Sequence, residues 1–261
     1  MSEALLPEYT GAVPDLYTIS AVAGTFLLAG TVKGVIGLGL ATVSLGLLAA
    51  ALDLTTAMAL LIVPTFVTNL WQAVVGGNGY ALLMRIWPFL LMATATVWLG
   101  ATALTRMDLS LLSALLGGLL VVYSMLNLAG VRLAIPAQRE TWTGPLFGTA
   151  NGVLTGMTGS FVVPGVMFLQ AIGLPRDVLI QAMGILFTAS TVALALALQG
   201  NGLLTVQLTA VSAAAVIPAA VGMLAGQGIR RRLSEDRFRE FFFLAILALG
   251  SHIITKAAVG P

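Results

Sequence analysis

Cysteine is absent from the 261 residues. Without a thiol, the chain cannot form disulfides, use a cysteine nucleophile or hold a metal through thiolates. The single histidine, His252, has no second histidine and no nearby carboxylate in the sequence, so we interpret it as structural. Catalysis commonly needs a paired acid and base or a metal. We therefore predict no catalytic residue, no metal site and no cofactor.

Charge is also scarce, at 8% of the residues against about 25% in ordinary soluble domains. So few charges cannot build a surface that faces water. Apolar residues make up 59% of the chain and form runs such as Val178–Leu198 and Leu203–Gly226. Each run is long enough to cross a hydrocarbon layer of about 30 Å. We predict an all-α polytopic membrane protein whose first partner is the lipid bilayer.

Polar and glycine-rich points divide the chain into ten candidate segments. They lie near 17–32, 38–52, 54–75, 85–105, 109–129, 142–156, 160–173, 178–198, 203–226 and 238–258. The first two segments of each group of five have only 14 to 16 residues. At about 1.5 Å per residue they reach only about 21–24 Å, short of a full crossing. We predict that each pair forms a hairpin of short or broken helices.

The two groups of five segments are similar to each other. An offset of 122 residues superimposes Gly30 on Gly152, Gly34 on Gly156, Gly37 on Gly159, Leu52 on Leu174 and Gly100 on Gly222. The hydrophobic segments align at the same offset. We predict two membrane repeats, 1–130 and 131–261. Since five crossings is an odd number, the second repeat would enter the membrane inverted relative to the first.

The basic residues test this topology. Placing the arginine-rich segment 230–239 in the cytoplasm puts nine of them inside: Arg85, Arg132, Arg139, Arg176, Arg230, Arg231, Arg232, Arg237 and Arg239. Only Arg106 and Lys256 then fall outside, as the positive-inside rule favours. Both termini would lie outside the cytoplasm. A parallel arrangement with four crossings per half remains an alternative. The arginine cluster indicates a cytoplasmic loop, so no nucleic-acid partner is expected.

The stretch 30–39, GTVKGVIGLG, is the most informative, because four glycines and Lys33 interrupt an apolar run. Its counterpart is 151–160, NGVLTGMTGS. Non-helical backbone at membrane depth is tolerated only beside protein or a water-filled cavity. Two broken helices meeting there would direct backbone N–H groups at one spot, which suits an anion. The alternative for Lys33 is a side chain that snorkels to the interface.

Polar side chains also gather on one face of segment 54–75. Asn69 and Gln72 are three residues apart, and Thr65 and Thr68 lie on or near the same face. Such residues either line a path or hold helices together. Because they share one face, we favour the interpretation that they line a substrate path, and helix packing remains the alternative. Asp53, just before this segment, is predicted to cap the helix that begins at Leu54.

The chain resembles the sulfite exporter TauE/SafE family of bacterial membrane permeases. The resemblance rests on 30–39, SLGLL at 44–48, VTNLWQ at 67–72 and TGMTGSFVVPG at 155–165, and it spans nearly the whole length. It implies movement of sulfite, sulfoacetate and related organosulfur anions across the cell inner membrane, often as export. The family commonly has a proline after the first glycine cluster. Pro164 matches this proline in the second half, but the stretch that follows the glycine cluster of the first half has no proline.

We therefore predict a secondary transporter of a small anion, such as sulfite or a short organosulfonate, acting as an exporter. Lys33 would supply fixed charge, backbone N–H groups near Gly34, Gly37, Gly156 and Gly159 would be donors, and the shell would be completed by Asn69, Gln72, Thr155, Thr158 and Ser160. Alternation would come from one half rocking against the other. The alternatives are an anion channel or, less favoured, a membrane-embedded enzyme. The sequence leaves open the coupling ion and a homo-oligomer.

Overall fold

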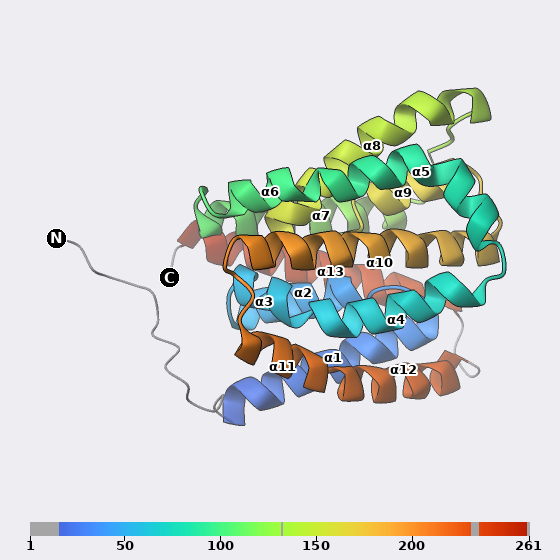
Figure 1. The fold of residues 1–261 in the computed structure, drawn as a ribbon. Helices are drawn as coiled ribbons and strands as arrows, with labels where there is room; N and C mark the ends of the chain where they lie inside the picture. The colour runs from blue at the N-terminus through green and yellow to red at the C-terminus, as the bar shows by residue number, and fades with distance from the viewer. Residues whose placement is uncertain (1–15, 132, 231–234, 260–261) are drawn as a thin grey trace.

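The computed structural model describes residues 16–131, 133–230 and 235–259, which form α-helices and no strands. The helices are α1 (Leu16–Ile36), α2 (Leu40–Ala51), α3 (Leu54–Leu60), α4 (Ile62–Val75), α5 (Gly79–Ala95), α6 (Val97–Leu104), α7 (Leu109–Leu128), α8 (Ala137–Thr158), α9 (Gly165–Ala171), α10 (Arg176–Gly200), α11 (Val206–Ala214), α12 (Val216–Arg230) and α13 (Glu235–Val259). Most of them run along one common direction and form a bundle (Figure 1).

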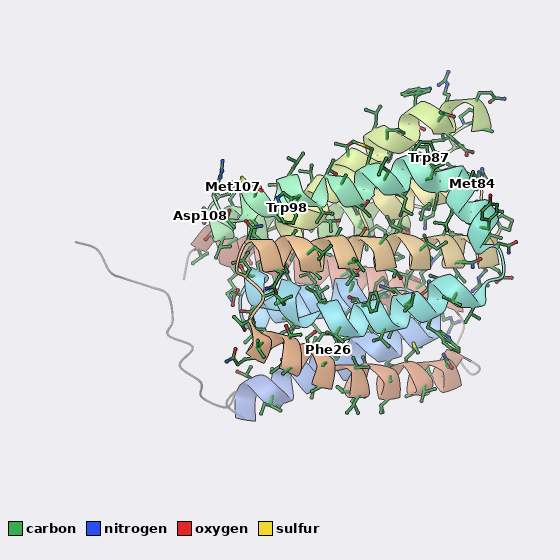
Figure 2. All side chains as sticks on the ribbon, viewed as in Figure 1. Phe26, Met84, Trp87, Trp98, Met107 and Asp108 are labelled. Atoms are coloured by element: carbon green, nitrogen blue, oxygen red, sulfur yellow. The ribbon has the colours of Figure 1, made fainter. Side chains whose placement is uncertain are left out.

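Six stretches of the described chain are long and apolar enough to cross a membrane. They are α1, the pair α5–α6, α7, α10, the pair α11–α12, and α13. The pair α3–α4 is bent by 45° and makes a seventh if it counts as one span. Large apolar side chains point outward from the bundle, among them Trp87 and Trp98, which are 55% and 51% exposed (Figure 2). The chain is a multi-pass membrane protein, and these side chains suit contact with lipid.

Each of the ten predicted segments overlaps one helix or one helix pair. The predicted lengths of two of them are wrong, because α1 and α8 have 21 and 22 residues. Gly34 and Gly156 lie inside these helices and do not end them. The helices end one turn later, where Gly37 and Gly159 adopt positive φ angles of 81° and 73°. Each proposed hairpin therefore has one long arm and one short arm, α2 or α9.

Glycines let α1 and α12 approach until their backbones touch. A Cβ atom on Gly30 would collide with the carbonyl oxygen of Ala219, and one on Gly34 with that of Met223. Gly222 of α12 faces the carbonyl oxygen of Leu27 in the same way. Small residues spaced four apart allow such close packing in membranes, where van der Waals contact drives helix association.

The helix α8 packs against α5 and α6 by the same device. A Cβ atom on Gly152 would lie 2.7 Å from the carbonyl oxygen of Ala93, and one on Gly156 would collide with that of Val97. Gly100 of α6 meets the carbonyl oxygen of Val153. The first helix of each half thus packs on the fourth segment of the other half. This exchange supports two related halves, 1–130 and 131–261, which we keep as a proposal.

The two ends of the bundle differ in charge. Helices α4 and α12 end, and α5, α10 and α13 begin, at one end, called here the basic end (Figure 1). Arg85, Arg139 and Arg237 belong to it, whereas Arg106 and Lys256 belong to the opposite end. Helix α1 begins and α13 ends at that opposite end, and α8 runs against α1 (Figure 1). Arg132, Arg231, Arg232 and the two chain termini lie outside the described residues.

Candidate functional site

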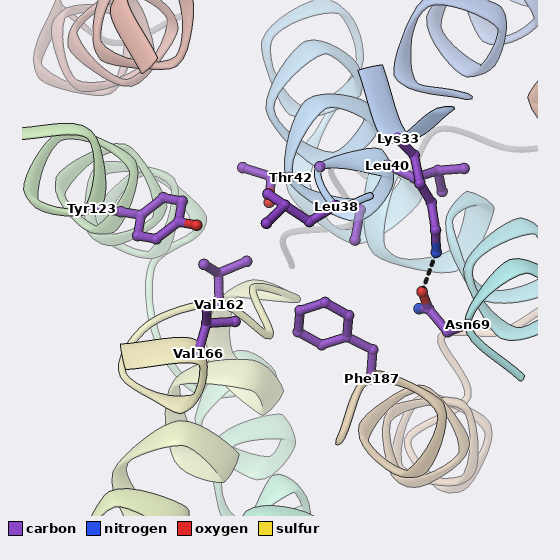
Figure 3. Close-up of a pocket in the computed structure, with 11 residues that line it drawn as sticks. Lys33, Leu38, Leu40, Thr42, Asn69, Tyr123, Val162, Val166 and Phe187 are labelled. Atoms are coloured by element: carbon purple, nitrogen blue, oxygen red, sulfur yellow. Dashed lines mark hydrogen bonds between the residues drawn. The ribbon is translucent and has the colours of Figure 1, made fainter. Parts of the chain in front are cut away.

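Lys33 lies in the last turn of α1 and is only 6% exposed. Its ammonium group donates a hydrogen bond to Thr68 Oγ1, at 3.1 Å. It also donates one to Asn69 Oδ1 (Figure 3). Within the described residues, no carboxylate lies within 4.0 Å of Lys33 Nζ. The partners of this buried cation are therefore neutral. Such an arrangement is costly unless an anion or water completes it.

Helix α4 presents the two partners of Lys33 on one face. Thr68 and Asn69 are 5% and 2% exposed. The Thr68 hydroxyl also donates to the carbonyl oxygen of Pro64 at 2.8 Å, one turn back, which fixes the orientation in which it accepts from Lys33. The sequence placed Lys33 and Asn69 in one site, and the structure brings them into direct contact.

A small cavity, the inner cavity, lies beside Lys33 and Asn69 and between the two helix breaks (Figure 3). Its volume of about 10 Å³ is close to that needed for one water molecule. It is lined by Lys33, Leu38, Gly39, Leu40, Ala41, Thr42, Asn69, Tyr123, Val162, Val166 and Phe187. Residues from α1, α2, α4, α7, α9 and α10 therefore converge there.

The start of α2 forms one wall of the inner cavity. Gly39 precedes this helix with a φ angle of 106°, and the first hydrogen bond of the helix runs from the N–H of Val43 to the carbonyl oxygen of Gly39 at 2.8 Å. The amide groups of residues 40 to 42 therefore have no partner within the helix. Free amides at a helix N-terminus, together with the helix dipole, favour an anion.

A larger cavity, called here the Lys33 vestibule, has a volume of about 470 Å³ and leads from Lys33 to the basic end. It is lined by Lys33, Gly34, Gly37, Thr68, Trp71, Gln72, Val75, Gly76, Asp177, Ile180, Gln181, Met223 and Gln227. Asp177, which is exposed near the start of α10, is the one carboxylate among the residues that line it. The volume falls within the range of typical ligand pockets, about 300–1,000 Å³.

Gln72 lines this vestibule, yet its amide nitrogen donates to the carbonyl oxygen of Ile180 at 2.8 Å. In return, the amide nitrogen of Gln181 donates to the carbonyl oxygen of Ala73 at 2.8 Å. These reciprocal bonds join α4 to α10. One of the two N–H donors of the Gln72 side chain is therefore used in helix packing, which was the alternative interpretation.

The glycines predicted as backbone donors do not have free N–H groups. Gly34 and Gly156 are inside helices, where amides bond within the helix. The N–H of Gly37 bonds to the carbonyl oxygen of Lys33 at 2.8 Å, and that of Gly159 to Thr155 at 2.7 Å. The N–H groups of Gly37 and Gly159 are occupied because these two glycines cap the carboxyl ends of their helices; a role for amides near them in binding stays a prediction. The free donors belong to the next helix, α2.

The second-half candidates also lie away from Lys33. Thr155, Thr158 and Ser160 are buried but line neither cavity. Thr155 Oγ1 donates to the carbonyl oxygen of Ser160 at 3.0 Å, and Thr158 Oγ1 to that of Leu154 at 2.7 Å. Their hydroxyls stabilise their own helix break. Val162 and Val166 reach the inner cavity in their place.

Sequence reasoning missed Tyr123, Phe187 and the start of α2. Tyr123 is 1% exposed, and its hydroxyl points toward the inner cavity (Figure 3). A tyrosine in the middle of an apolar membrane helix, away from the interface where tyrosine is common, was an available signal. Phe187 carries no comparable signal, since an apolar residue in an apolar helix is ordinary.

Comparison with known proteins identifies a family. The sequence model of the family described as "Sulfite exporter TauE/SafE" matches residues 22–253. No curated protein matches the chain, and no solved structure matches it. The matched range begins within α1 and ends within α13, so it includes both helix breaks and both cavities.

Proposed function

Because this chain belongs to the sulfite exporter TauE/SafE family, whose members are membrane permeases and not enzymes, we propose that it is a secondary transporter for a small oxyanion. The substrate class is sulfite or a short organosulfonate, and the membrane is the bacterial inner membrane. The proposal rests on one observation above all. Lys33 is a buried cation with neutral partners that lies between the inner cavity and the vestibule.

An anion would complete the electrostatics of Lys33. Burial removes most of the hydration of the ammonium group, and Thr68 and Asn69 replace only part of it. A bound oxyanion brings an opposite charge and several acceptor oxygens. Charge-assisted hydrogen bonds of this kind are roughly twice as strong as neutral ones. The site therefore favours an anion over a neutral solute of the same size.

The amides at the start of α2 offer a further set of donors for an anion. They and Lys33 line the same inner cavity, so an anion there could accept from both. The inner cavity of about 10 Å³ holds no more than about one water molecule as it stands. An oxyanion would therefore bind first on the vestibule side of Lys33, and it would reach α2 only when the inner cavity widens.

The position of the vestibule fits export. It opens at the basic end, which the positive-inside rule assigns to the cytoplasm. An anion would then enter from the cytoplasm and meet Lys33 inside the bundle. Under the same assignment, the start of α1 and the end of α13 lie on the outer side, as the predicted outside termini require.

Counterflow in proteoliposomes tests this function. Vesicles preloaded with unlabelled sulfite should accelerate the entry of labelled sulfite, and initial rates should saturate with concentration. The same vesicles with sulfate, acetate and a neutral sulfone measure anion selectivity. A channel would instead give flux without saturation and without acceleration by internal substrate. Absence of any protein-dependent sulfite flux or binding would remove the proposal.

A further inference from the structure

The Lys33 vestibule has a counterpart in the second half of the chain. Adding or subtracting the offset of 122 residues relates Lys33, Gly37, Thr68 and Ile180 to Thr155, Gly159, Ser190 and Met58. The second set comes from α8, the break that follows it, α10 and α3. It would line a passage to the end opposite the basic end, if the two halves are inverted repeats.

This counterpart region is closed. Ser190, Thr155 and Met58 are at most 1% exposed. The contrast is clear at the two equivalent glycines. A Cβ atom on Gly37 would have no atom within 4 Å, whereas one on Gly159 would lie 2.7 Å from Met58 Cγ. The first half is therefore open at the position where the second half is plugged by a methionine side chain.

The counterpart region contains unsatisfied polar atoms. Within the described residues, three buried side-chain atoms have no hydrogen-bond partner: Ser190 Oγ and Asn151 Nδ2 in the second half, and Ser124 Oγ in α7 of the first half. Leaving a buried donor or acceptor unpaired costs about 1–3 kcal/mol. In the open half, Thr68, the equivalent of Ser190, contacts Lys33 and lines the vestibule. Water in an opened counterpart would satisfy Ser190 in the same position.

The packing shows which surfaces can separate. Glycine-to-carbonyl contacts hold α1 on α12 and α8 on α5 and α6, while reciprocal glutamine bonds hold α4 on α10. The vestibule lies between the first of these units and the α4–α10 unit. Helix α10 packs on α5 and α6 more extensively than its equivalent, α4, packs on α11 and α12. The interface of α10 on the closed side is therefore more extensive than the equivalent interface of α4 on the open side.

We propose that a second vestibule opens between α8, α10 and α3, and that it admits the same small oxyanion from the end opposite the basic end while the Lys33 vestibule closes. Thr155 and Ser190 line it, and Met58 against Gly159 is its gate. Helices α8, α5 and α6, which are held together by the glycine contacts and come from both halves, move as one rigid group. This inference rests on the proposed function and adds to it the second route and the surfaces that part.

Site-directed labelling tests this inference, because the chain has no native cysteine. We would compare the Ser190→Cys variant with Val75→Cys, at the Lys33 vestibule, and with Leu116→Cys, which is fully buried in α7. A charged, impermeant thiol reagent is applied to each membrane face separately. Ser190→Cys should react at least tenfold faster than Leu116→Cys, and only from the face opposite to the one that labels Val75→Cys.

Two changes at the gate sharpen this test. Met58→Ala should increase the labelling rate of Ser190→Cys, and Met58→Phe should decrease it and slow sulfite flux. Labelling of Ser190→Cys no faster than that of Leu116→Cys, with and without Met58→Ala, would overturn the second vestibule. So would labelling of Ser190→Cys from both membrane faces at similar rates, since that describes an open pore.

The two proposals fail separately. Loss of the proposed function means no binding or flux of sulfite, whatever the labelling pattern. Failure of the second vestibule means an unreactive Ser190→Cys variant in a protein that still binds sulfite. Thermal unfolding of each cysteine variant, compared with the unsubstituted protein, shows that the labelled chain is folded.

Discussion

Replacing Lys33 with methionine is the sharpest perturbation of the proposed site, because it removes the charge but keeps a similar length of apolar side chain. The ammonium group contacts Thr68 and Asn69 and is 6% exposed, so water cannot take its place freely. If an anion binds at Lys33, the Lys33→Met variant leaves that anion without its cation at membrane depth.

The expected loss follows from the buried contact. Truncating one partner of a buried, hydrogen-bonded charge pair costs about 2–5 kcal/mol. Since about 1.4 kcal/mol is a factor of ten in affinity, the Kd for sulfite should rise by roughly 30-fold or more. Lys33→Arg should retain part of the affinity, because the charge remains while its shape and hydration change.

Although Lys33→Met should weaken anion binding, it should leave the stability of the empty protein unchanged or increase it. In the empty protein, Lys33→Met removes a desolvated cation, whose burial costs several kcal/mol even after relaxation. It also leaves Asn69 Oδ1 without its donor, at a cost of about 1–3 kcal/mol. Thr68 keeps its bond to Pro64. We expect the thermal midpoint of the empty variant to equal or exceed that of the native protein.

The chain offers a matched control, since Lys256 is its one other lysine. Lys256 donates to the carbonyl oxygen of Ala50 at 2.7 Å, at the end opposite the vestibule. Sulfite affinity is measured on purified Lys33→Met, Lys33→Arg and Lys256→Met proteins, and counterflow is measured at equal protein density. Native affinity in Lys33→Met would refute the reasoning, as would an equal loss in Lys256→Met. A lower thermal midpoint with unchanged affinity would assign Lys33 to helix packing.

Three further outcomes are expected. In thermal unfolding, Gly34→Ala should destabilise the protein by about 1–3 kcal/mol, because the new Cβ atom meets the α12 backbone. Gly24→Ala should be neutral or slightly stabilising, because its Cβ atom would have no atom within 4 Å. Arg85→Met and Glu140→Gln should show a coupling of about 0.3–1 kcal/mol in a double-mutant cycle, and zero coupling would mean that their bidentate bond does not tie α5 to α8. An epitope inserted in 231–234 should be protected from external protease and reporters at both termini should map outside; termini on opposite faces would contradict the inverted arrangement.

The class and the helices of this protein could be predicted because hydrophobicity and helix capping are local properties. Ten apolar segments found in the sequence correspond to the observed helices or helix pairs. The predicted cap is confirmed as well, since Asp53 Oδ1 accepts the N–H of Thr56 at 2.8 Å. The contact between Lys33 and Asn69 was also within reach, because an intramembrane cation needs polar neighbours and few exist.

The roles of the glycines could not be predicted, because glycine serves several purposes that look alike in sequence. Gly34 permits a close helix contact, Gly37 ends the same helix, and Gly39 precedes the next one. Which role applies depends on the partner helix, and the partner of α1 is α12, almost 200 residues away. The free amides at the start of α2 are found only once the helix break is placed to within one residue.

The charge of the site is present in one half only, and this asymmetry has a physical reason. The counterpart of Lys33 at the offset of 122 residues is Thr155, which is neutral and fully buried. A second lysine there would add another desolvated cation to the bundle. A permeation site must also bind its substrate strongly enough to attract it and weakly enough to release it. One lysine with neutral donors meets both demands. The anion would therefore gain most of its binding energy from the first half, and the second half would serve mainly to open and close its route.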